Sequence, residues 1–551
     1  MSFTQAPPQL SNPYDSDRVL RSIMRRSLPD SLFAEFATQA HALGRLIAED
    51  LYPQQLHERL IEPRHHPFDA WGQRVDRIDL TPLWQRMPLI TARFGFVWHG
   101  YDAAKAEHAR LFQFGMVYLF AAASDFYACP LAMTDGAARA LLESGNRYLI
   151  DRAVPHFTAR EASALWTCGQ WMTETTGGSD VGGTQTRAVQ NADGQWRIYG
   201  RKWFTSAVTS EAALLLARPD GNPDGTDGLA LFYLETKNAD GELQNIVVDR
   251  LKDKLGSRKL PTAELRLEGA PATLVGEDRR GVRLIAPLLN QTRVWNALAA
   301  ISYFRRGLQL LRDFAGRRVV FGRRLREQPL HHETVAGLQA EFEAGLHLSL
   351  YVAQLLGRSE HAVSDEHERL LLRLLVPIVK LLTAKQSVGG ISEIVEGFGG
   401  AGYIEDTGLP VLLRDVQVFS IWEGTTDVLS LDAMKALRSD AVWLALDAVL
   451  ANLASKSDAA VTNHLAAIRA AVSGARAAYV ERAESAARGI AMTLGRGFAL
   501  ALLLRHAAWA QRVEGDSRPL AAAQRFAAHG ISRLLDASAE NARRLATDDL
   551  E

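Results

Sequence analysis

The sequence predicts an α+β fold in which a small β domain is inserted between helical regions. Residues 1–165, and the chain after residue 282, carry Ala, Leu and Glu at helical spacing. Between them, residues 166–282 are rich in β-prone and turn-forming residues. One block of strands between two blocks of helices is typical of an α+β assembly, and it differs from the strand–helix alternation of a parallel α/β fold.

Length and composition indicate a globular protein with several domains. A chain of 551 residues is too long for one ordinary core, so about two to four domains are expected. Apolar residues make up 47% and charged residues 23%, which excludes a disordered chain. The net charge of −1 gives no general attraction to nucleic acid or to an acidic membrane, so either partner would need a local patch.

The small number of cysteines and the short apolar runs favour a soluble, cytoplasmic protein. Cys129 and Cys168 cannot form a disulfide framework, and neither has a Cys or His partner at metal-ligand spacing. We therefore expect two core cysteines and no metal site. Residues 1–26 lack the apolar stretch of a secretory signal. The run at 498–504 has seven residues, whereas a spanning helix needs about 20.

Helices are expected in the first zone, and strands in the second. Residues 31–51 and 137–148 have helical spacing, with prolines interrupting the pattern between them. In the second zone, Asp193 and Gly194 form a turn between β-prone stretches, which predicts a hairpin. Further strands are predicted at the apolar runs 213–217 and 229–234 and at the alternating segment 263–267.

Long helices are predicted again at residues 330–356 and 367–388, with an interruption at 397–402. Near residue 440 the composition shifts to an Ala- and Arg-rich helical texture. These boundaries predict an N-terminal helical domain at 1–165, a middle β domain at 166–282, a helical bundle at 283–440 and an extra C-terminal helical module at 441–551.

The first motif that could carry chemistry is Met-Thr-Glu-Thr-Thr-Gly-Gly-Ser-Asp, at residues 172–180. Consecutive glycines let the backbone approach a phosphate or a flat ring closely. The neighbouring hydroxyl groups add hydrogen-bond donors. A polar surface turn is the plainer interpretation of the Gly-Gly-Ser-Asp segment taken alone.

Two further motifs suit a large planar cofactor that carries phosphates. Trp203 and Phe204 precede Thr205, so aromatic faces and a hydroxyl group lie together. Arg317 and Arg318 precede Phe321, and arginine offers a planar fork for a pyrophosphate. Taken singly, the tryptophan could equally cap a β-domain core, and the arginines could form a solvated helix end.

The fourth motif combines a glycine-rich loop with an isolated acid. The loop at 396–403 does not have the spacing of a dinucleotide-binding fingerprint between strand and helix, which disfavours a Rossmann fold. Glu423 lies between Trp422 and Gly424, where apolar neighbours would raise its pKa toward the range of a general base. A structural acid paired with an arginine explains Glu423 equally well in isolation.

Taken in order, these motifs resemble the acyl-CoA dehydrogenase family. The resemblance covers the Thr-Glu-x-x-Gly-Gly-Ser-Asp loop, the Trp-x-Thr strand, the Arg-x-x-Phe-Gly helix end, the Phe-Gly-Gly-x-Gly-Tyr loop and the Glu-Gly-Thr turn. Segments 171–174, 249–258 and 420–424, the N-terminal Pro-Pro-x-Leu and the extra C-terminal module are similar to its AidB-type branch, bacterial proteins linked to DNA alkylation. The resemblance then spans nearly the whole chain.

The resemblance implies an FAD-binding, acyl-CoA dehydrogenase-like fold, assembled as a dimer or tetramer. Thr173 would face the flavin edge, Trp203 and Thr205 would pack on and bond to the ring, and Arg318 with Phe321 would contact the FAD of a neighbouring subunit. The full set implied to bind FAD is Met172, Thr173, Gly178, Ser179, Trp203, Phe204, Thr205, Arg318, Phe321, Glu396, Gly399, Gly400, Trp422, Gly424, Thr425 and Asp427. Ser179, Arg293 and Gly424 are implied to bind the acyl-CoA thioester.

In this family the position of Glu423 is the catalytic base, which takes the α-proton while the β-hydride passes to the flavin. Electrons would then leave to an electron-transfer partner. Three positions depart from the usual pattern: Glu396 and Asp427 replace glutamines, and Trp422 replaces a tyrosine. The AidB-type branch shares some of these changes, and the resemblance therefore implies a dehydrogenase of low activity.

Two alternatives stay open at this point. One is an FAD-containing protein that binds double-stranded DNA and keeps its flavin mainly as a structural group. Residues 487–534 carry seven arginines against two acids, a local net charge of +5, and Arg505, Arg512, Arg518 and Arg525 are the candidate phosphate contacts. Such binding would be independent of base sequence. A solvated helix face or a subunit contact explains the same arginines. The other alternative is a flavin oxidase of a small substrate, which Glu423 disfavours because an Asp would be expected there.

Overall fold

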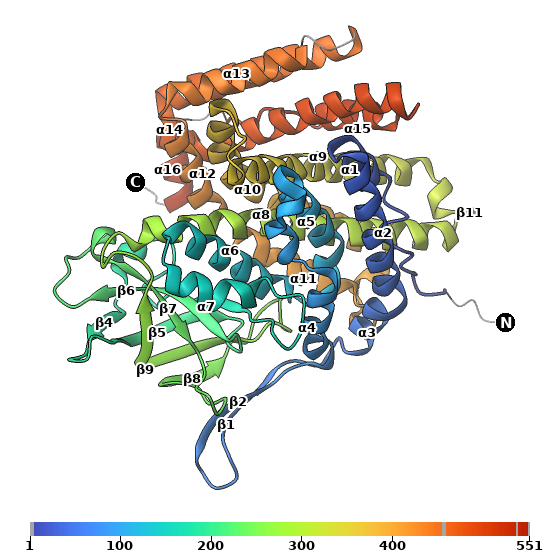
Figure 1. Cartoon of the computed structure of the whole chain (residues 1–551). Coiled ribbons are helices and arrows are strands. Elements are labelled where there is room, and N and C mark those ends of the chain that lie inside the picture. The colour runs from blue at the N-terminus through green and yellow to red at the C-terminus, as the bar shows by residue number, and fades with distance from the viewer. Residues whose placement is uncertain (1–4, 455–458, 536–537, 549–551) are drawn as a thin grey trace.

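A β domain from the middle of the chain lies against one side of a helical body built from both ends of the chain (Figure 1). The computed structural model describes residues 5–454, 459–535 and 538–548. Helices, then strands, then helices follow one another along the chain. The predicted α+β class is therefore confirmed.

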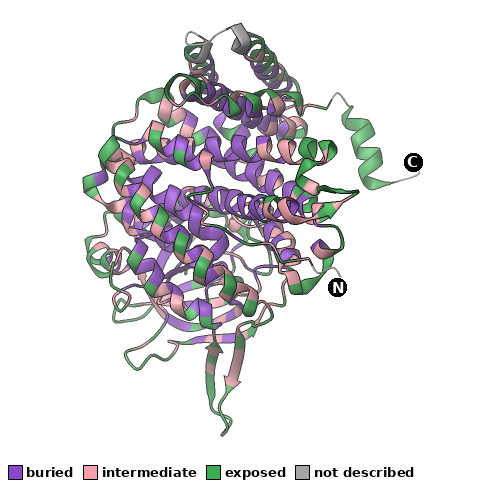
Figure 2. Ribbon diagram, turned by 90° about the vertical axis from the view of Figure 1, so that its right-hand side faces the viewer, coloured by how far each residue is buried: buried purple, intermediate pink, exposed green. Residues whose placement is uncertain are grey.

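The N-terminal region is helical, but it also contains a hairpin that the sequence did not predict. Its helices are α1 (Arg18–Ser27), α2 (Asp30–Leu46), α3 (Tyr52–His57), α4 (Pro82–Phe94), α5 (Ala109–Phe120), α6 (Ala128–Ser144) and α7 (Arg147–Phe157). Strands β1 (Arg64–Phe68) and β2 (Arg74–Asp79) pair antiparallel and project from the body (Figure 2). The Asp76 carboxylate accepts a hydrogen bond from the Val248 backbone N–H at 3.1 Å, which attaches the hairpin to the β domain.

Two expected helices have different boundaries from those predicted. The segment 31–51 is helical, with α2 continuing into a π-helical turn over Ile47–Leu51. The segment 137–148 is not one helix, because α6 ends at Gly145, whose φ of 69° is left-handed, and Asn146 caps α7. Glycine is the residue that adopts this conformation without strain, so the local chemistry of Gly145 and Asn146 overrides the Ala- and Leu-rich pattern.

The β domain is a closed ring of strands. Its members are β3 (Cys168–Gln170), β4 (Arg187–Gln190), β5 (Trp196–Ser206), β6 (Ala212–Pro219), β7 (Ala230–Glu235), β8 (Ile246–Leu251) and β9 (Thr262–Leu274). The pairings run β6–β4–β5–β9–β7 and return to β6, with β3 beside β6 and β8 beside β9. The predicted hairpin is confirmed, since β4 and β5 pair antiparallel on either side of Asp193 and Gly194.

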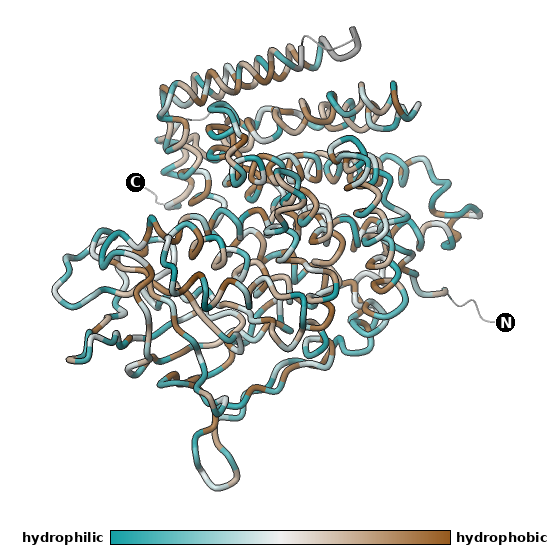
Figure 3. Tube along the Cα trace, viewed as in Figure 1, coloured by the Kyte–Doolittle hydropathy of each residue, from teal (hydrophilic) through white to brown (hydrophobic). Residues whose placement is uncertain are grey.

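Long buried helices form the centre of the molecule, where Figures 2 and 3 show buried and hydrophobic residues along their lengths. They are α8 (Gly281–Arg317), α9 (Pro329–Glu360) and α10 (Glu366–Gly397), followed by α11 (Leu409–Val416) and α12 (Thr426–Ala436). Short strands β10 (Val319–Val320) and β11 (Arg323–Arg324) form the turn between α8 and α9. Apolar residues of these helices and of α1, α2 and α5 share one core.

The C-terminal module packs on the same bundle. It contains α13 (Asp440–Ala454), α14 (Ala459–Val513, bent at Arg482), α15 (Arg518–Ala528) and the exposed α16 (Ala539–Thr547). Helix α14 contacts α9, α10, α12 and α15. By length and composition α10 and the segment Asn463–Val513 could cross a membrane, but 78% and 83% of their most apolar windows are buried within the protein, as in core helices.

Candidate active site

Glu423 occupies a strained turn that presents its carboxylate to a helix. The turn precedes α12, and Glu423 itself has a left-handed φ of 57°, followed by Gly424 at 102°. The Thr292 hydroxyl of α8 donates to the Glu423 carboxylate at 2.6 Å. The Lys380 ammonium of α10 donates to the Gly424 carbonyl at 2.6 Å. A strained backbone held by two separate helices is a feature that functional sites often show.

Burial raises the pKa of the Glu423 carboxyl, and the Thr292 hydrogen bond, Arg293 and Lys380 partly offset that effect. Burial also lowers the pKa of Lys380 to about 7. Arg293 donates to Asp432 at 2.8 Å, and Arg373 donates to the same side chain at 2.6 Å. Among the described residues Glu423 therefore has no ion-pair partner, and its carboxyl group has a raised pKa, as a general base requires.

A small apolar cavity opens beside Glu423. Its volume is about 40 Å³, and Glu423 is the only acid that lines it. The walls carry apolar and aromatic side chains together with Thr292 and Asn296: Ala121, Phe126, Ala128, Cys129, Ala132, Met133, Trp295, Ala299, Tyr303, Phe419 and Trp422. The Trp422 indole N–H donates to the Asn296 side chain, which fixes one wall. An acid facing an apolar chamber suits removal of a proton from a hydrocarbon chain.

The predicted loop at 172–180 is anchored by a buried ion pair. Glu174 accepts from the Lys202 ammonium at 2.9 Å and from the Thr186 hydroxyl at 2.6 Å, and both Glu174 and Lys202 are buried. The Trp203 backbone N–H donates to the Thr173 carbonyl at 2.9 Å. The structure thus brings the loop and the Trp-x-Thr strand together, with Met172 half-buried and Ser179 exposed.

Two observations on these residues fit a flavin. The Thr205 hydroxyl is buried and has no hydrogen-bond partner among the described residues, so it is available to a ligand atom. A Cβ atom on Gly178 would lie 2.5 Å from the Thr173 hydroxyl, so this position admits only glycine in its present geometry. A hydroxyl without a protein partner on the Trp-x-Thr strand and a tight glycine loop that this strand contacts both suit the edge of a planar ring.

Trp203 and Phe204 have a neighbour that the sequence did not indicate. The Lys252 ammonium lies 3.1 Å from the centre of the Trp203 ring and 4.7 Å from that of Phe204. Lys252 is itself paired with Glu264 at 2.7 Å. One face of the Trp203 indole is therefore covered by a cation.

The remaining predicted FAD residues form a second group at the far end of α8. Arg318 caps α8, and Phe321, on the following turn, is 99% exposed. Phe398, which precedes Gly399 and Gly400, packs on Phe314 of α8 at 4.9 Å. Glu396 is exposed at the end of α10. Thr292, which contacts Glu423, and Arg318 are 26 residues apart on α8, so Arg318 lies about 39 Å from Thr292 at 1.5 Å per residue.

The two predicted residues that follow the Glu423 turn serve α12. The Thr425 hydroxyl caps α12 by accepting from the Val428 backbone N–H at 3.5 Å. Asp427 is exposed and lies 3.9 Å from Arg488 of α14. Thr425 therefore has a local structural role, and Asp427 links α12 to the C-terminal module.

The four arginines proposed for DNA are divided between two cavities. Arg505 and Arg512 line one, and Arg518 and Arg525 line another. Arg518 is paired with Asp516 at 2.8 Å, and Arg525 with Glu333 at 2.7 Å. The expected single cationic face is therefore absent from the described residues, because intervening helices separate the arginines and acids pair half of them. DNA binding stays a prediction from the sequence.

Three residues that shape the site were not predicted. Thr292 is adjacent to Arg293, which the resemblance did indicate, and its hydroxyl is the one that reaches Glu423. Lys380 is the one charged residue in the apolar run 374–384 of α10, and this was a signal in the sequence. Asp432 pairs with Arg293 but carries no local pattern.

The fold and the site define a flavoprotein dehydrogenase class, and comparison with known proteins identifies the family. Four family descriptions match successive segments: "Adaptive response protein AidB N-terminal domain" at 5–162, "Acyl-CoA dehydrogenase, middle domain" at 169–270, "Acyl-CoA dehydrogenase, C-terminal domain" at 279–438, and "Acyl-CoA dehydrogenase 11 C-terminal domain-like" at 433–549. Together they cover most of the chain.

Two curated relatives and one solved structure agree with these matches. Acyl-CoA dehydrogenase family member 11 of Caenorhabditis elegans is 40% identical over 92% of this chain and 86% of its own length. The putative acyl-CoA dehydrogenase AidB of Escherichia coli is 33% identical over 68% and 69%. The crystal structure of C. elegans ACDH-11 in complex with C11-CoA is 37% identical, with a TM-score of 0.94 over 100% of this chain and 97% of that one.

The chain belongs to the acyl-CoA dehydrogenase family, in its AidB-type group. It is therefore an FAD-dependent acyl-CoA dehydrogenase, and FAD is the cofactor of the family. The resemblance inferred from the five sequence motifs is confirmed.

Proposed function

We propose that this protein removes the α-proton of an acyl-CoA thioester with the Glu423 carboxylate. The observation that carries the proposal is the placement of Glu423 as the only acid on an apolar cavity, with its carboxylate held by Thr292. The bound FAD would accept the β-hydride of the same substrate. The strained turn aims the Glu423 carboxylate, and the Thr292 hydrogen bond favours the ionised form that accepts a proton.

The residues of the β domain are the proposed flavin contacts. Thr205 offers a hydroxyl that lacks a protein partner, and Thr173 and Gly178 offer a loop that can approach a ring. Burial, the larger effect, raises the pKa of the Cys129 thiol, and Lys254, after β8, lies near enough to Cys129 for its charge to lower that pKa. Cys129 lines the cavity with Glu423. A flavin held by the β domain would thus lie close to the base.

The apolar lining of the Glu423 cavity supports an aliphatic acyl group as the substrate class, and at about 40 Å³ the cavity must widen to admit more than the atoms next to the base. The related C. elegans protein was solved with C11-CoA, and we propose a medium or long acyl-CoA for this chain too. Arg293 donates hydrogen bonds to Asp432 and to the Glu423 carbonyl, and it is the proposed contact for the CoA portion. We further propose that the reduced flavin passes its electrons to an electron-transfer partner and that the protein is cytoplasmic.

The test is anaerobic reduction of the yellow protein by a panel of saturated acyl-CoAs of increasing length. We expect bleaching of the flavin absorbance with an aliphatic acyl-CoA and its loss in Glu423→Gln, which keeps the shape but removes the base. A positioned base contributes roughly 10² to 10⁴ in rate. Ser420→Ala, next to the same turn, is the matched control and should bleach like the parent. Equal bleaching by Glu423→Gln would make Glu423 a structural acid.

A further inference from the structure

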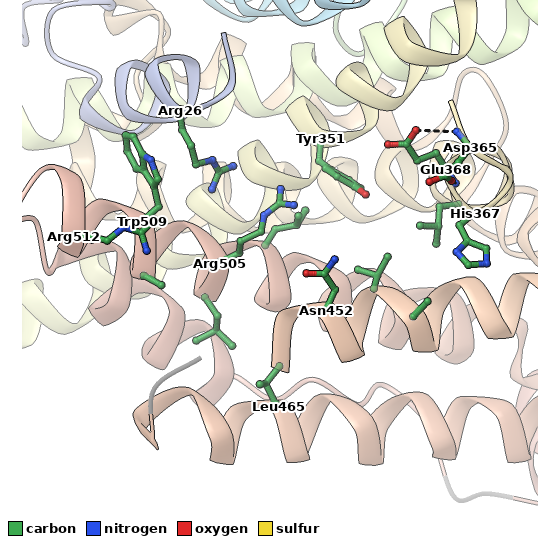
Figure 4. Close-up of a pocket in the computed structure, with 16 residues that line it drawn as sticks. Arg26, Tyr351, Asp365, His367, Glu368, Asn452, Leu465, Arg505, Trp509 and Arg512 are labelled. Carbon is green, nitrogen blue, oxygen red and sulfur yellow. Dashed lines mark hydrogen bonds between the residues drawn. The ribbon is translucent and has the colours of Figure 1, made fainter. Parts of the chain in front are cut away.

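A second cavity, with a volume of about 530 Å³, lies between the C-terminal module and the helical bundle (Figure 4). Helices α13 and α14 form one wall, and α9, α10 and the end of α1 form the other. None of its lining residues lines the cavity that holds Glu423. It is therefore a separate chamber, and the proposed dehydrogenation does not use it.

Three arginines face this chamber from two elements. Arg26 comes from the end of α1, and its side chain extends toward that of Arg505 (Figure 4). Arg505, Trp509 and Arg512 follow one another at intervals of four and three residues on α14, which places them on one helical face. The chamber thus has a cationic end with an indole ring beside it.

No acid neutralises these arginines among the described residues. Arg26 bonds to the His506 ring at 3.0 Å, and the Arg505 guanidinium lies 5.5 Å from the centre of the Tyr351 ring. Neither these two nor Arg512 forms an ion pair within the described part of the chain. Burial, reinforced by the nearby Arg505, lowers the pKa of Arg26 to about 9. Arg26 is half-buried, Arg505 and Arg512 are exposed at the chamber, and an anionic ligand would supply the counterion that all three lack.

The other titratable groups of the chamber cannot supply the missing negative charge. Glu368 accepts from the Arg358 guanidinium at 2.9 Å, and Asp365 caps α10 by accepting from the Glu368 backbone N–H at 2.8 Å. Both acids lie at the opposite end of the chamber from Arg26 (Figure 4). Burial, followed by Arg26, lowers the pKa of His506 to about 3, so this ring is neutral at physiological pH.

Apolar side chains line much of the chamber between its cationic and acidic ends, together with Asn452, and the chamber is larger than a bare inorganic anion. Its walls are formed by Leu371, Ala448, Val449, Leu465, Leu502 and Ala508. We propose that this chamber binds a phosphomonoester with an apolar or aromatic body. Three guanidinium forks match a group that bears more than one negative charge, and arginine binds phosphate oxygens in pairs. The apolar walls and Trp509 would hold the body of the molecule.

Isothermal titration calorimetry on the full-length, FAD-loaded protein tests this proposal. The probes are decyl phosphate, AMP, inorganic phosphate and decanoate, each below the concentration at which it aggregates. We expect decyl phosphate or AMP to bind once per chain, and at least about tenfold more tightly than decanoate, because charge-assisted bonds to phosphate are the stronger ones. The tighter of the two phosphomonoesters identifies the body as aliphatic or aromatic.

The double substitution Arg505→Gln and Arg512→Gln should weaken that binding about tenfold or more and leave the flavin content and acyl-CoA reduction unchanged. Arg469→Gln changes the charge of an exposed residue on the same helix, outside the chamber, and should bind like the parent. If the double variant does not fold, Arg26→Gln on α1 provides the same test.

Several outcomes would overturn the proposal. They are no binding of either phosphomonoester at millimolar concentration, equal affinity for decanoate, or unchanged affinity in a folded variant. Binding of a DNA duplex that needs Arg505 and Arg512, without binding of either phosphomonoester, would assign the arginines to nucleic acid. A lower molar mass of the double variant in light scattering, again without phosphomonoester binding, would assign them to a subunit contact.

Discussion

At the scale of single residues, the hydrogen bond from Thr292 to Glu423 sets the pH range over which the proposed base is ionised. Burial raises the pKa of Glu423, and this hydrogen bond is the first of the effects that lower it. Thr292→Val removes the bond and keeps the shape of the side chain. The pKa of Glu423 should therefore rise further in this variant, because the ionised carboxylate loses a hydrogen bond that favours it.

The direction of the shift in the pH profile follows from the role of the base, which must be unprotonated to accept the α-proton. As the pH is lowered, Thr292→Val should lose flavin reduction at a higher pH than the parent does. At alkaline pH the rates of the two proteins should become equal. The measurement is the rate of anaerobic flavin reduction against pH. Thr292→Ser, which keeps the hydroxyl, should restore the parental profile. An unshifted profile in Thr292→Val would show that Thr292 does not affect the ionisation of Glu423.

The Lys202–Glu174 pair makes a second prediction at the same scale. Both side chains are buried, so Lys202→Met leaves the Glu174 carboxylate without its counterion in the interior. Removing one partner of a buried pair costs about 3–5 kcal/mol. We expect the free energy of unfolding in urea to fall by that amount and FAD to dissociate more readily. Replacing both residues, Lys202→Met with Glu174→Gln, should recover part of the loss, and no loss in the single variant would contradict the role of this pair.

Sequence reasoning found the residues that lie in contiguous motifs and missed those that long-range packing supplies. The Glu-Gly-Thr turn predicted Glu423, and the loop at 172–180 predicted Thr173 and Gly178. Thr292 is 131 positions from Glu423 along the chain, and no local pattern reports that separation. Lys252 beside Trp203 is another such neighbour. Contacts of this kind depend on how domains pack, and the periodicity of one segment gives no information about that packing.

At the scale of elements, the crossing of α8 and α10 depends on a glycine. A Cβ atom on Gly390 would lie 2.3 Å from the Phe304 ring of α8, whereas one on Gly389 would meet nothing within 4 Å. Gly390→Ala should lower the free energy of unfolding by about 1–3 kcal/mol through overpacking. Gly389→Ala should leave it unchanged or raise it by up to about 1 kcal/mol, because alanine favours helix. Urea unfolding of the two variants tests the contrast, and equal effects would contradict the packing argument.

The types of the elements were predictable where the apolar periodicity extends over many residues, as in α9 and α10. They were less predictable where a single residue sets the end of a helix. Gly145 and Asn146 divide one predicted helix into α6 and α7 through a left-handed cap. The β1–β2 hairpin lies among the prolines that were expected only to break helices. Its attachment through Asp76 to Val248 is again a contact between distant segments.

At the scale of the whole molecule, the predicted FAD residues fall in two groups, one in the β domain and one beyond the C-terminal end of α8. Thr173 and Thr205 belong to the β domain, while Arg318 and Phe321 follow the C-terminal end of α8, about 39 Å from Thr292 by helix rise. We propose that each FAD is held by the first group of one subunit and the second group of another. The double substitution Arg318→Ala and Phe321→Ala should then lower FAD retention although both side chains are remote from Glu423.

Complementation between subunits gives the sharper form of this prediction. Thr205→Val and the Arg318→Ala, Phe321→Ala variant should each retain little FAD when produced alone. In a mixed dimer one of the two shared sites contains both defects and the other contains none, because the defects lie on different subunits. Co-expression with different tags, followed by purification through both, should therefore recover about half of the parental FAD content if the sites are independent. Recovery of none, with the mixed dimer intact by light scattering, would mean that each subunit binds its FAD alone.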